Sequence, residues 1–161
     1  MNFETEVVSC LPRLRCYARA LTRDFAWADD LVQDTALRAL ERRAAFRPDT
    51  NLLAWLLTIL RHIYIDELRG RREFVVDDES APWDGLEAPY SEIDRLVLRD
   101  VQRALYRITA DQREVLLLVY VEELTYQQTS VVLEVPIGTV MSRLARAREY
   151  LRKLLPGELA H

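Results

Sequence analysis

The stretch "LTYQQTSVVLEVPIGTVMSRLARAREYLRKLL", residues 124–155, decides how the second half of the chain folds. Thr125 followed by Gln128 is typical of a capping box, and it predicts a helix that runs to about residue 132. Pro136 stands where a second helix would begin, and that helix is expected over about 137–155. A short helix joined by a turn of about four residues to a longer, basic helix predicts a helix-turn-helix.

The longer helix has an apolar stripe and an opposite polar face. The stripe consists of Ile137, Val140, Met141, Leu144, Leu151 and Leu155. A recognition helix contacts base edges from its first turns, and Arg, Ser and Thr side chains add phosphate contacts. The candidate DNA-binding residues on the polar face are therefore Thr139, Ser142, Arg143 and Arg146. The alternative is an ordinary solvated helix face.

Charge is unevenly distributed along the chain, whose net charge is −4. Residues 73–100 carry 2 basic and 9 acidic side chains, whereas residues 135–155 carry four arginines and one lysine against one glutamate. Because salt screens charges beyond roughly 8 Å, local patches decide binding, and the acidic total does not exclude nucleic acid. The segment "EFVVDDESAPWDGLEAPYSE" contains two prolines and a glycine and has no helical period, so it predicts a linker.

The first half of the chain also reads as helical. Apolar residues recur at helical spacing around residues 11–21 and 28–39, and residues 51–70 are apolar around most of the helix circumference. This third helix should be central in a bundle and should end at Gly70 as a C-cap. Thr109 with Gln112 adds another capping signal, and further helices are expected over about 92–106 and 110–122. We therefore expect an all-α protein with helical domains at 1–72 and 92–161 and a flexible acidic linker at 73–91.

Composition argues against several classes of protein. The longest apolar runs are too short for a membrane span, and the first ten residues lack the layout of a signal peptide, so we expect a cytoplasmic protein without membrane insertion. Two cysteines do not make a disulfide framework. His62 and Asp66 could share a metal, but they lack a third ligand. We expect no enzyme, no metal and no cofactor.

The two halves together resemble a known family. Residues 124–155 resemble the promoter-binding helix-turn-helix of the extracytoplasmic-function sigma factors, the group-four members of the sigma-seventy family. Residues 12–72, with "DDLVQD" and the run from "WL" to "IDELR", resemble the other domain of that family. The stretch "TNLLAWLLTILRH" looks most like the general-stress branch.

The resemblance implies a promoter-specificity subunit of RNA polymerase. The C-terminal domain would read the minus-thirty-five element, and the N-terminal domain would bind the clamp helices of the largest core subunit and open the minus-ten element. An anti-sigma factor would be a further partner. The candidate core-binding residues are Asp30, Gln33, Asp34 and Leu37. The candidate minus-ten residues are Trp55, Arg61, His62, Arg69 and Arg72.

Some residues depart from the family pattern, and other functions stay open. His62 stands where the family more often has Asn, and Glu134 stands where Gly is frequent. Met141, at the edge of the reading face, stands where Lys or Arg is usual. Trp55 is also expected as a core residue, and His62 could pack against the bundle. A sigma-like decoy that sequesters an anti-sigma factor, or a helix-turn-helix repressor, are the alternative functions. A decoy would lose DNA-facing arginines, whereas Arg143 and Arg146 are present.

Overall fold

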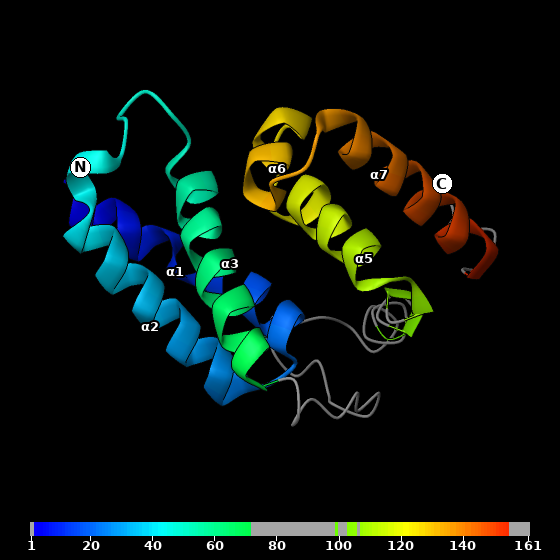
Figure 1. Cartoon of the computed structure of the whole chain (residues 1–161), viewed down its shortest axis with the longest axis horizontal. Coiled ribbons are helices and arrows are strands. Elements are labelled where there is room, and N and C mark those ends of the chain that lie inside the picture. Colours follow the sequence, from blue (N-terminus) through cyan, green and yellow to red (C-terminus); the bar gives the residue numbers. More distant parts are fainter. Residues whose placement is uncertain (1, 72–98, 100–102, 106, 155–161) are drawn as a thin grey trace. The chain divides into compact units, whose positions relative to one another are not determined.

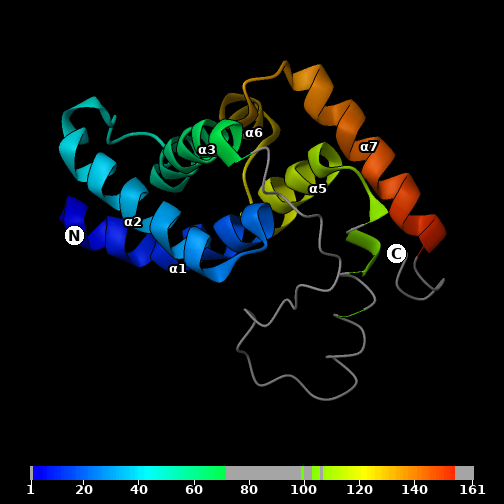
Figure 2. The ribbon, with the colours of Figure 1, turned by 60° about the horizontal axis from the view of Figure 1, so that its bottom comes forward.

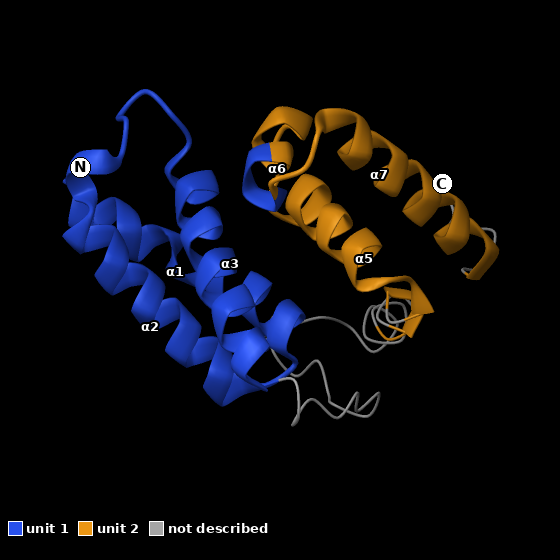
Figure 3. Ribbon diagram, in the orientation of Figure 1, with its two compact units in different colours: residues 1–81, 131–133 blue, residues 82–130, 134–161 orange. Residues whose placement is uncertain are grey.

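The computed structural model describes residues 2–71, 99, 103–105 and 107–154. The chain divides into two compact units, residues 1–81 with 131–133 and residues 82–130 with 134–161 (Figure 3). In their described parts both units contain helices and no strand, which confirms the all-α prediction. The predicted linker, Arg72 and most of the expected 92–106 helix lie outside the described residues.

Three helices form the first unit: α1 (Phe3–Thr22), α2 (Phe25–Glu41) and α3 (Leu52–Arg71). Each packs against the other two, and a short 3-10 turn, η1 (Arg43–Ala45), follows α2 (Figure 1). The core side chains are almost fully buried and include Leu14, Tyr17, Leu31, Leu56, Leu57 and Leu60. Thr35 is buried among them, and its hydroxyl donates to the Leu31 carbonyl at 2.7 Å, which satisfies its polar group.

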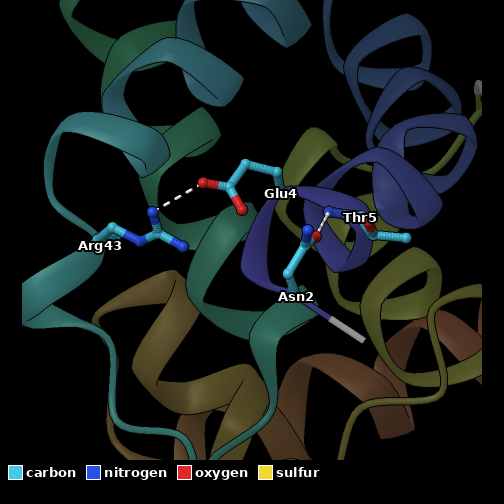
Figure 4. Close-up of polar contacts among 4 residues, drawn as sticks. All are labelled: Asn2, Glu4, Thr5 and Arg43. Atoms are coloured by element: carbon cyan, nitrogen blue, oxygen red, sulfur yellow. Dashed lines mark hydrogen bonds and ion pairs between the residues drawn. The ribbon is translucent and has the colours of Figure 1, made fainter.

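Polar caps fix where these helices begin. The Asn2 side chain accepts from the Thr5 amide at 2.8 Å (Figure 4). The Asp24 side chain accepts from the Trp27 amide at 3.0 Å. Each cap satisfies one of the amides that a helix N-terminus leaves without an intrahelical partner. Gly70 is not the C-cap: α3 continues to Arg71, and no glycine in the described residues has a positive φ. Gly70 is therefore an interior helical residue.

The second unit contains α5 (Ala110–Leu116), η2 (Leu117–Val121), α7 (Ile137–Leu154) and residues 126–130 of α6 (Tyr126–Leu133). Helix α5 packs against α7, and the two lie side by side in Figure 2. The predicted helix 110–122 is not uniform, because residues 117–121 form a π turn. The Glu122 amide donates to the Leu117 carbonyl at 2.9 Å, five residues back rather than four.

The helix-turn-helix is confirmed in its geometry. The Thr125 and Gln128 side chains each accept from the other residue's backbone amide, at 3.0 and 2.9 Å, so the capping box is complete. The turn between α6 and α7 is residues 134–136. Glu134 has a φ of 56°, and the next amide, Val135, donates to the Ser130 carbonyl at 3.1 Å. This is a Schellman motif with a glutamate where glycine is usual.

Candidate nucleic-acid interface

Helix α7 presents one buried and one exposed face. Val140, Leu144 and Ala147 are buried against the rest of the unit. Ser142 and Arg146 are exposed on the opposite face. Because residues spaced by three or four positions share a helix face, these two form one surface with Glu149 and Lys153, which are also exposed. This outward face is where the sequence predicted it, and its second and third turns carry the Ser142 hydroxyl and the Arg146 guanidinium.

Thr139 and Arg143 lie at the flank of this face rather than on it. Both are half-buried. The Arg143 guanidinium lies 3.8 Å from the Asp111 carboxylate of α5, with side-chain exposures of 27% and 64%. The Ser142 hydroxyl donates to the Thr139 carbonyl at 3.2 Å. Arg146 is thus the more accessible of the two predicted arginines, because Arg143 makes an ion pair inside its own unit.

Two members of the predicted apolar stripe do not pack. Ile137 is 47% exposed and Met141 is 52% exposed. The buried face is centred on Val140, Leu144 and Ala147, so residues 137 and 141 fall at its edge. The apolar stripe is thus wider than the part of α7 that its neighbours cover, and Met141 is exposed, in keeping with its expected place at the edge of the reading face.

Arg148 is a site residue that the sequence did not single out. Its Nε donates to the Tyr120 hydroxyl, and its guanidinium carbon lies 5.3 Å from the Tyr120 ring centroid. Hydrogen bonding to Tyr120, and then to Tyr126, raises the pKa of the Arg148 guanidinium. Two tyrosines therefore hold this cation at the side of α7. A contact between residues 28 positions apart leaves no periodic signal in the sequence.

The predicted core-binding residues share the outer face of α2. Asp30, Gln33, Asp34 and Leu37 are all exposed. Leu37 is 59% exposed, and Leu40 beside it is 39% exposed. The buried face of α2 consists of Trp27, Ala28, Leu31, Val32, Thr35 and Ala39. The structure thus brings the four predicted residues together as an acidic stripe that contains an exposed leucine.

The predicted minus-ten residues separate into three environments on α3. Trp55 is half-buried in an aromatic cluster, with ring centroids 5.2 Å from Phe46 and 6.2 Å from Phe3. His62 and Arg69, seven residues apart, share an exposed face. Arg61 is half-buried and lies on another side of the helix. The Trp55 contacts agree with its expected packing role, whereas the exposure of His62 is at odds with a residue packed against the bundle.

A second cation is held at the end of α3. The Arg71 guanidinium carbon lies 4.2 Å from the Trp27 ring centroid. The Trp27 indole donates to a Glu67 carboxylate oxygen at 2.6 Å, and its ring lies 5.5 Å from that of Tyr64. Because a cation over an indole face is attracted by the ring quadrupole, Trp27 orients Arg71 beside the exposed Arg69. The sequence predicted basic residues here, but not the stacking of Arg71 on the Trp27 ring.

Neither a metal-site cluster nor a membrane-spanning helix is found among the residues that the structure describes. Within them, no three His, Cys, Asp or Glu side chains gather as a metal site. In the same residues, no helix combines the length and the apolarity that crossing a membrane requires.

Comparison with known proteins identifies both halves of the chain. Residues 7–74 match the model of sigma-70 region 2, and residues 98–151 match that of sigma-70 region 4. The chain is 36% identical to the sigma factor EcfG of Rhodopseudomonas palustris, over 96% of this chain and 85% of that protein. It is 34% identical to the sigma factor SigC of Mycobacterium tuberculosis, over 82% of this chain and 72% of that protein.

A solved structure agrees with these sequence matches. The sigma factor RpoE of Bartonella quintana, crystallised with the anti-sigma factor NepR, superposes with a TM-score of 0.80 at 35% identity. The match covers 94% of this chain and 95% of that one. Both regions occur here in the order expected from the sequence, with the helix-turn-helix inside the second. The chain therefore belongs to the extracytoplasmic-function sigma factors, group four of the sigma-70 family.

Proposed function

We propose that this sigma factor binds core RNA polymerase through its first unit and directs it to a subset of promoters in a stress response. The second unit reads the minus-thirty-five element, and α3 of the first unit contacts the minus-ten element. An anti-sigma factor holds the protein inactive until the inducing signal arrives.

The outward face of α7 is the observation that carries promoter reading. Ser142 and Arg146 are exposed in its second and third turns, while Val140 and Leu144 anchor the opposite side. A helix that follows such a tight turn enters the major groove with its N-terminal residues toward the base edges. Arg146 can make the bidentate contact with guanine that is the commonest specific contact in the groove.

The acidic stripe of α2 supports core binding. Asp30 and Asp34 are exposed at i, i+4 spacing, with Leu37 one turn further along. A partner helix that carries arginines and apolar side chains would neutralise the carboxylates and cover the leucine. We assign that partner to the clamp helices of the largest core subunit.

Anti-sigma control rests on similarity. The Bartonella quintana relative was crystallised with NepR, and its chain resembles this one over nearly the full length of both. We infer that an anti-sigma factor of the same kind binds the present chain and competes with core polymerase.

In vitro transcription with purified core polymerase tests the proposal. A sigma factor initiates RNA synthesis from its own promoters when it is added to core, and Arg146→Ala reduces this activity. Arg107→Ala, an exposed arginine of the same unit outside α7, is the matched control and should not reduce it. A decoy binds an anti-sigma factor but yields no transcript. A repressor binds promoter DNA without core and blocks initiation by another sigma factor.

A further inference from the structure

Ile137 and Met141 form an exposed apolar edge on the recognition helix. They are one helical turn apart, and 47% and 52% of their respective surfaces are exposed. Ala145, one turn further, is exposed as well. None of the three is needed to cover the core, because Val140, Leu144 and Ala147 already do so.

The position of this edge suits contact with DNA bases. Ile137 is the first residue of α7, and Met141 directly precedes Ser142 on the outward face. Along the same side of the helix the next exposed residues are Arg148 and Arg152, so the edge changes from apolar to cationic toward the C-terminus. A helix inserted by its N-terminal end places its first turns at the bases and its later turns at the phosphates.

Only one base presents an apolar group in the major groove. Thymine carries a 5-methyl group there, whereas the other bases present hydrogen-bond donors and acceptors. Methionine is unbranched and adaptable, and it packs well on small apolar groups. Resting on the proposed promoter function, we propose that Ile137 and Met141 contact the 5-methyl group of a thymine in the minus-thirty-five element and so select thymine at that position.

Uracil substitution isolates the methyl group. Holoenzyme made from the full chain and core polymerase first selects its preferred sequence from a promoter library that is randomised across the upstream element. Each thymine of the selected promoter is then replaced in turn by deoxyuridine, which changes no hydrogen-bonding group. We expect one position, or two adjacent ones, at which binding weakens about fourfold, the factor that corresponds to the ~0.8 kcal/mol of burying one methyl-sized group.

Variants of the chain link that effect to the apolar edge. Met141→Ala should bind the thymine and uracil promoters equally, and Met141→Leu should retain most of the difference. Val121→Ala removes an apolar side chain that is 50% exposed elsewhere in the same unit, and it should leave the difference intact. Because Met141 is exposed, thermal melts of Met141→Ala should match those of the wild type.

The possible failures are distinguishable. If the holoenzyme selects a sequence but tolerates uracil at every position, the methyl contact is wrong and the promoter function stands. If the uracil effect survives in the Ile137→Ala, Met141→Ala double variant, another residue reads the methyl group. If Met141→Ala instead loses affinity for core polymerase, the edge binds protein and the inference is overturned. A holoenzyme that selects no sequence refutes the proposed function itself.

Discussion

The Arg143 guanidinium lies 3.8 Å from the Asp111 carboxylate, and this ion pair connects the recognition helix α7 to α5. Pairs this exposed contribute about 0–1 kcal/mol to stability. Arg146, by contrast, is exposed on the outward face of the helix. Of the two predicted DNA-binding arginines, Arg143 therefore makes an ion pair within its own unit, whereas Arg146 is exposed to solvent.

We expect Arg146→Ala to weaken promoter binding by the roughly 1–3 kcal/mol of a good base contact, without lowering the melting temperature. Arg143→Ala should have a smaller effect on binding and a small loss of stability. Electrophoretic mobility shifts with holoenzyme, alongside thermal melts, separate the two effects. Equal losses of binding in both variants would contradict this ranking.

Asp34→Arg should lower the affinity for core polymerase, because it reverses the charge in the middle of the acidic stripe of α2. Since Asp34 is exposed, circular dichroism should show an intact helical protein. Asp49→Arg reverses the charge of another exposed aspartate in the same unit, and it serves as the matched control. Co-purification with core as strong for Asp34→Arg as for Asp49→Arg would remove this stripe from the interface.

His62→Asn should change which base is preferred at the flipped position of the minus-ten element. The imidazole is exposed on the same face of α3 as Arg69, so it is accessible to an unstacked base. An amide can pair with a base edge through two hydrogen bonds, whereas imidazole offers stacking and fewer bonds. Holoenzyme assayed on promoters with each of the four bases gives the ranking. An unchanged ranking would show that His62 does not contact that base.

Glu123→Gly and Glu134→Gly should each stabilise the second unit. Both glutamates have a φ of 56°, a conformation that costs an L-residue roughly 1–2 kcal/mol and glycine much less. Glycine loses part of this gain to its greater unfolded-state entropy, so about 0.5–1 kcal/mol should remain. Glu149→Gly makes the same chemical change inside α7, where it should destabilise by roughly 1 kcal/mol. Chemical denaturation measures the free energy of unfolding of the three variants. It should rise for Glu123→Gly and Glu134→Gly and fall for Glu149→Gly.

Glu4 should make a small contribution to stability that depends on pH. Its pKa is lowered by hydrogen bonding to its own backbone amide at the start of α1 and by Arg43, whose guanidinium lies 2.7 Å from the carboxylate (Figure 4). A lowered folded-state pKa gives stability that is present above the unfolded pKa and lost as pH falls through the folded one. Glu4→Gln should thus be less stable than the wild type near neutrality and equal to it in acid. A difference that persists unchanged in acid would assign the effect to packing.

The sequence predicted the elements well wherever caps and periodicity agreed. The complete capping box of Thr125 and Gln128 and the three-helix first unit follow from local rules. The faces of α2 and α7 followed from helical spacing, which is why Asp34 and Arg146 were placed on exposed surfaces. Such features depend on residues a few positions apart, and a single sequence displays them directly.

Features that depend on distant partners could not be predicted. Tyr120 with Arg148, and Trp27 with Arg71, meet only because packing brings their helices together. The exposure of Ile137 depends on how far the neighbouring helices reach around α7, and the periodicity along one helix does not contain that information. The prediction that Gly70 is the C-cap of α3 failed for a related reason: glycine can adopt the left-handed conformation of a cap, but its presence does not end a helix.

Because residues 117–121 form a π turn, the contact between Tyr120 and Arg148 depends on the number of residues in this segment as well as on their identity. It accommodates one residue more than an α-helical turn would, and each residue corresponds to about 100° of rotation around the axis. Deleting a single residue here would restore a regular helix and swing Tyr120 away from Arg148 without altering either side chain. In relatives, an insertion or deletion between α5 and α6 would thus separate the tyrosine from Arg148 of the recognition helix, a difference that residue-by-residue substitution scanning would never sample.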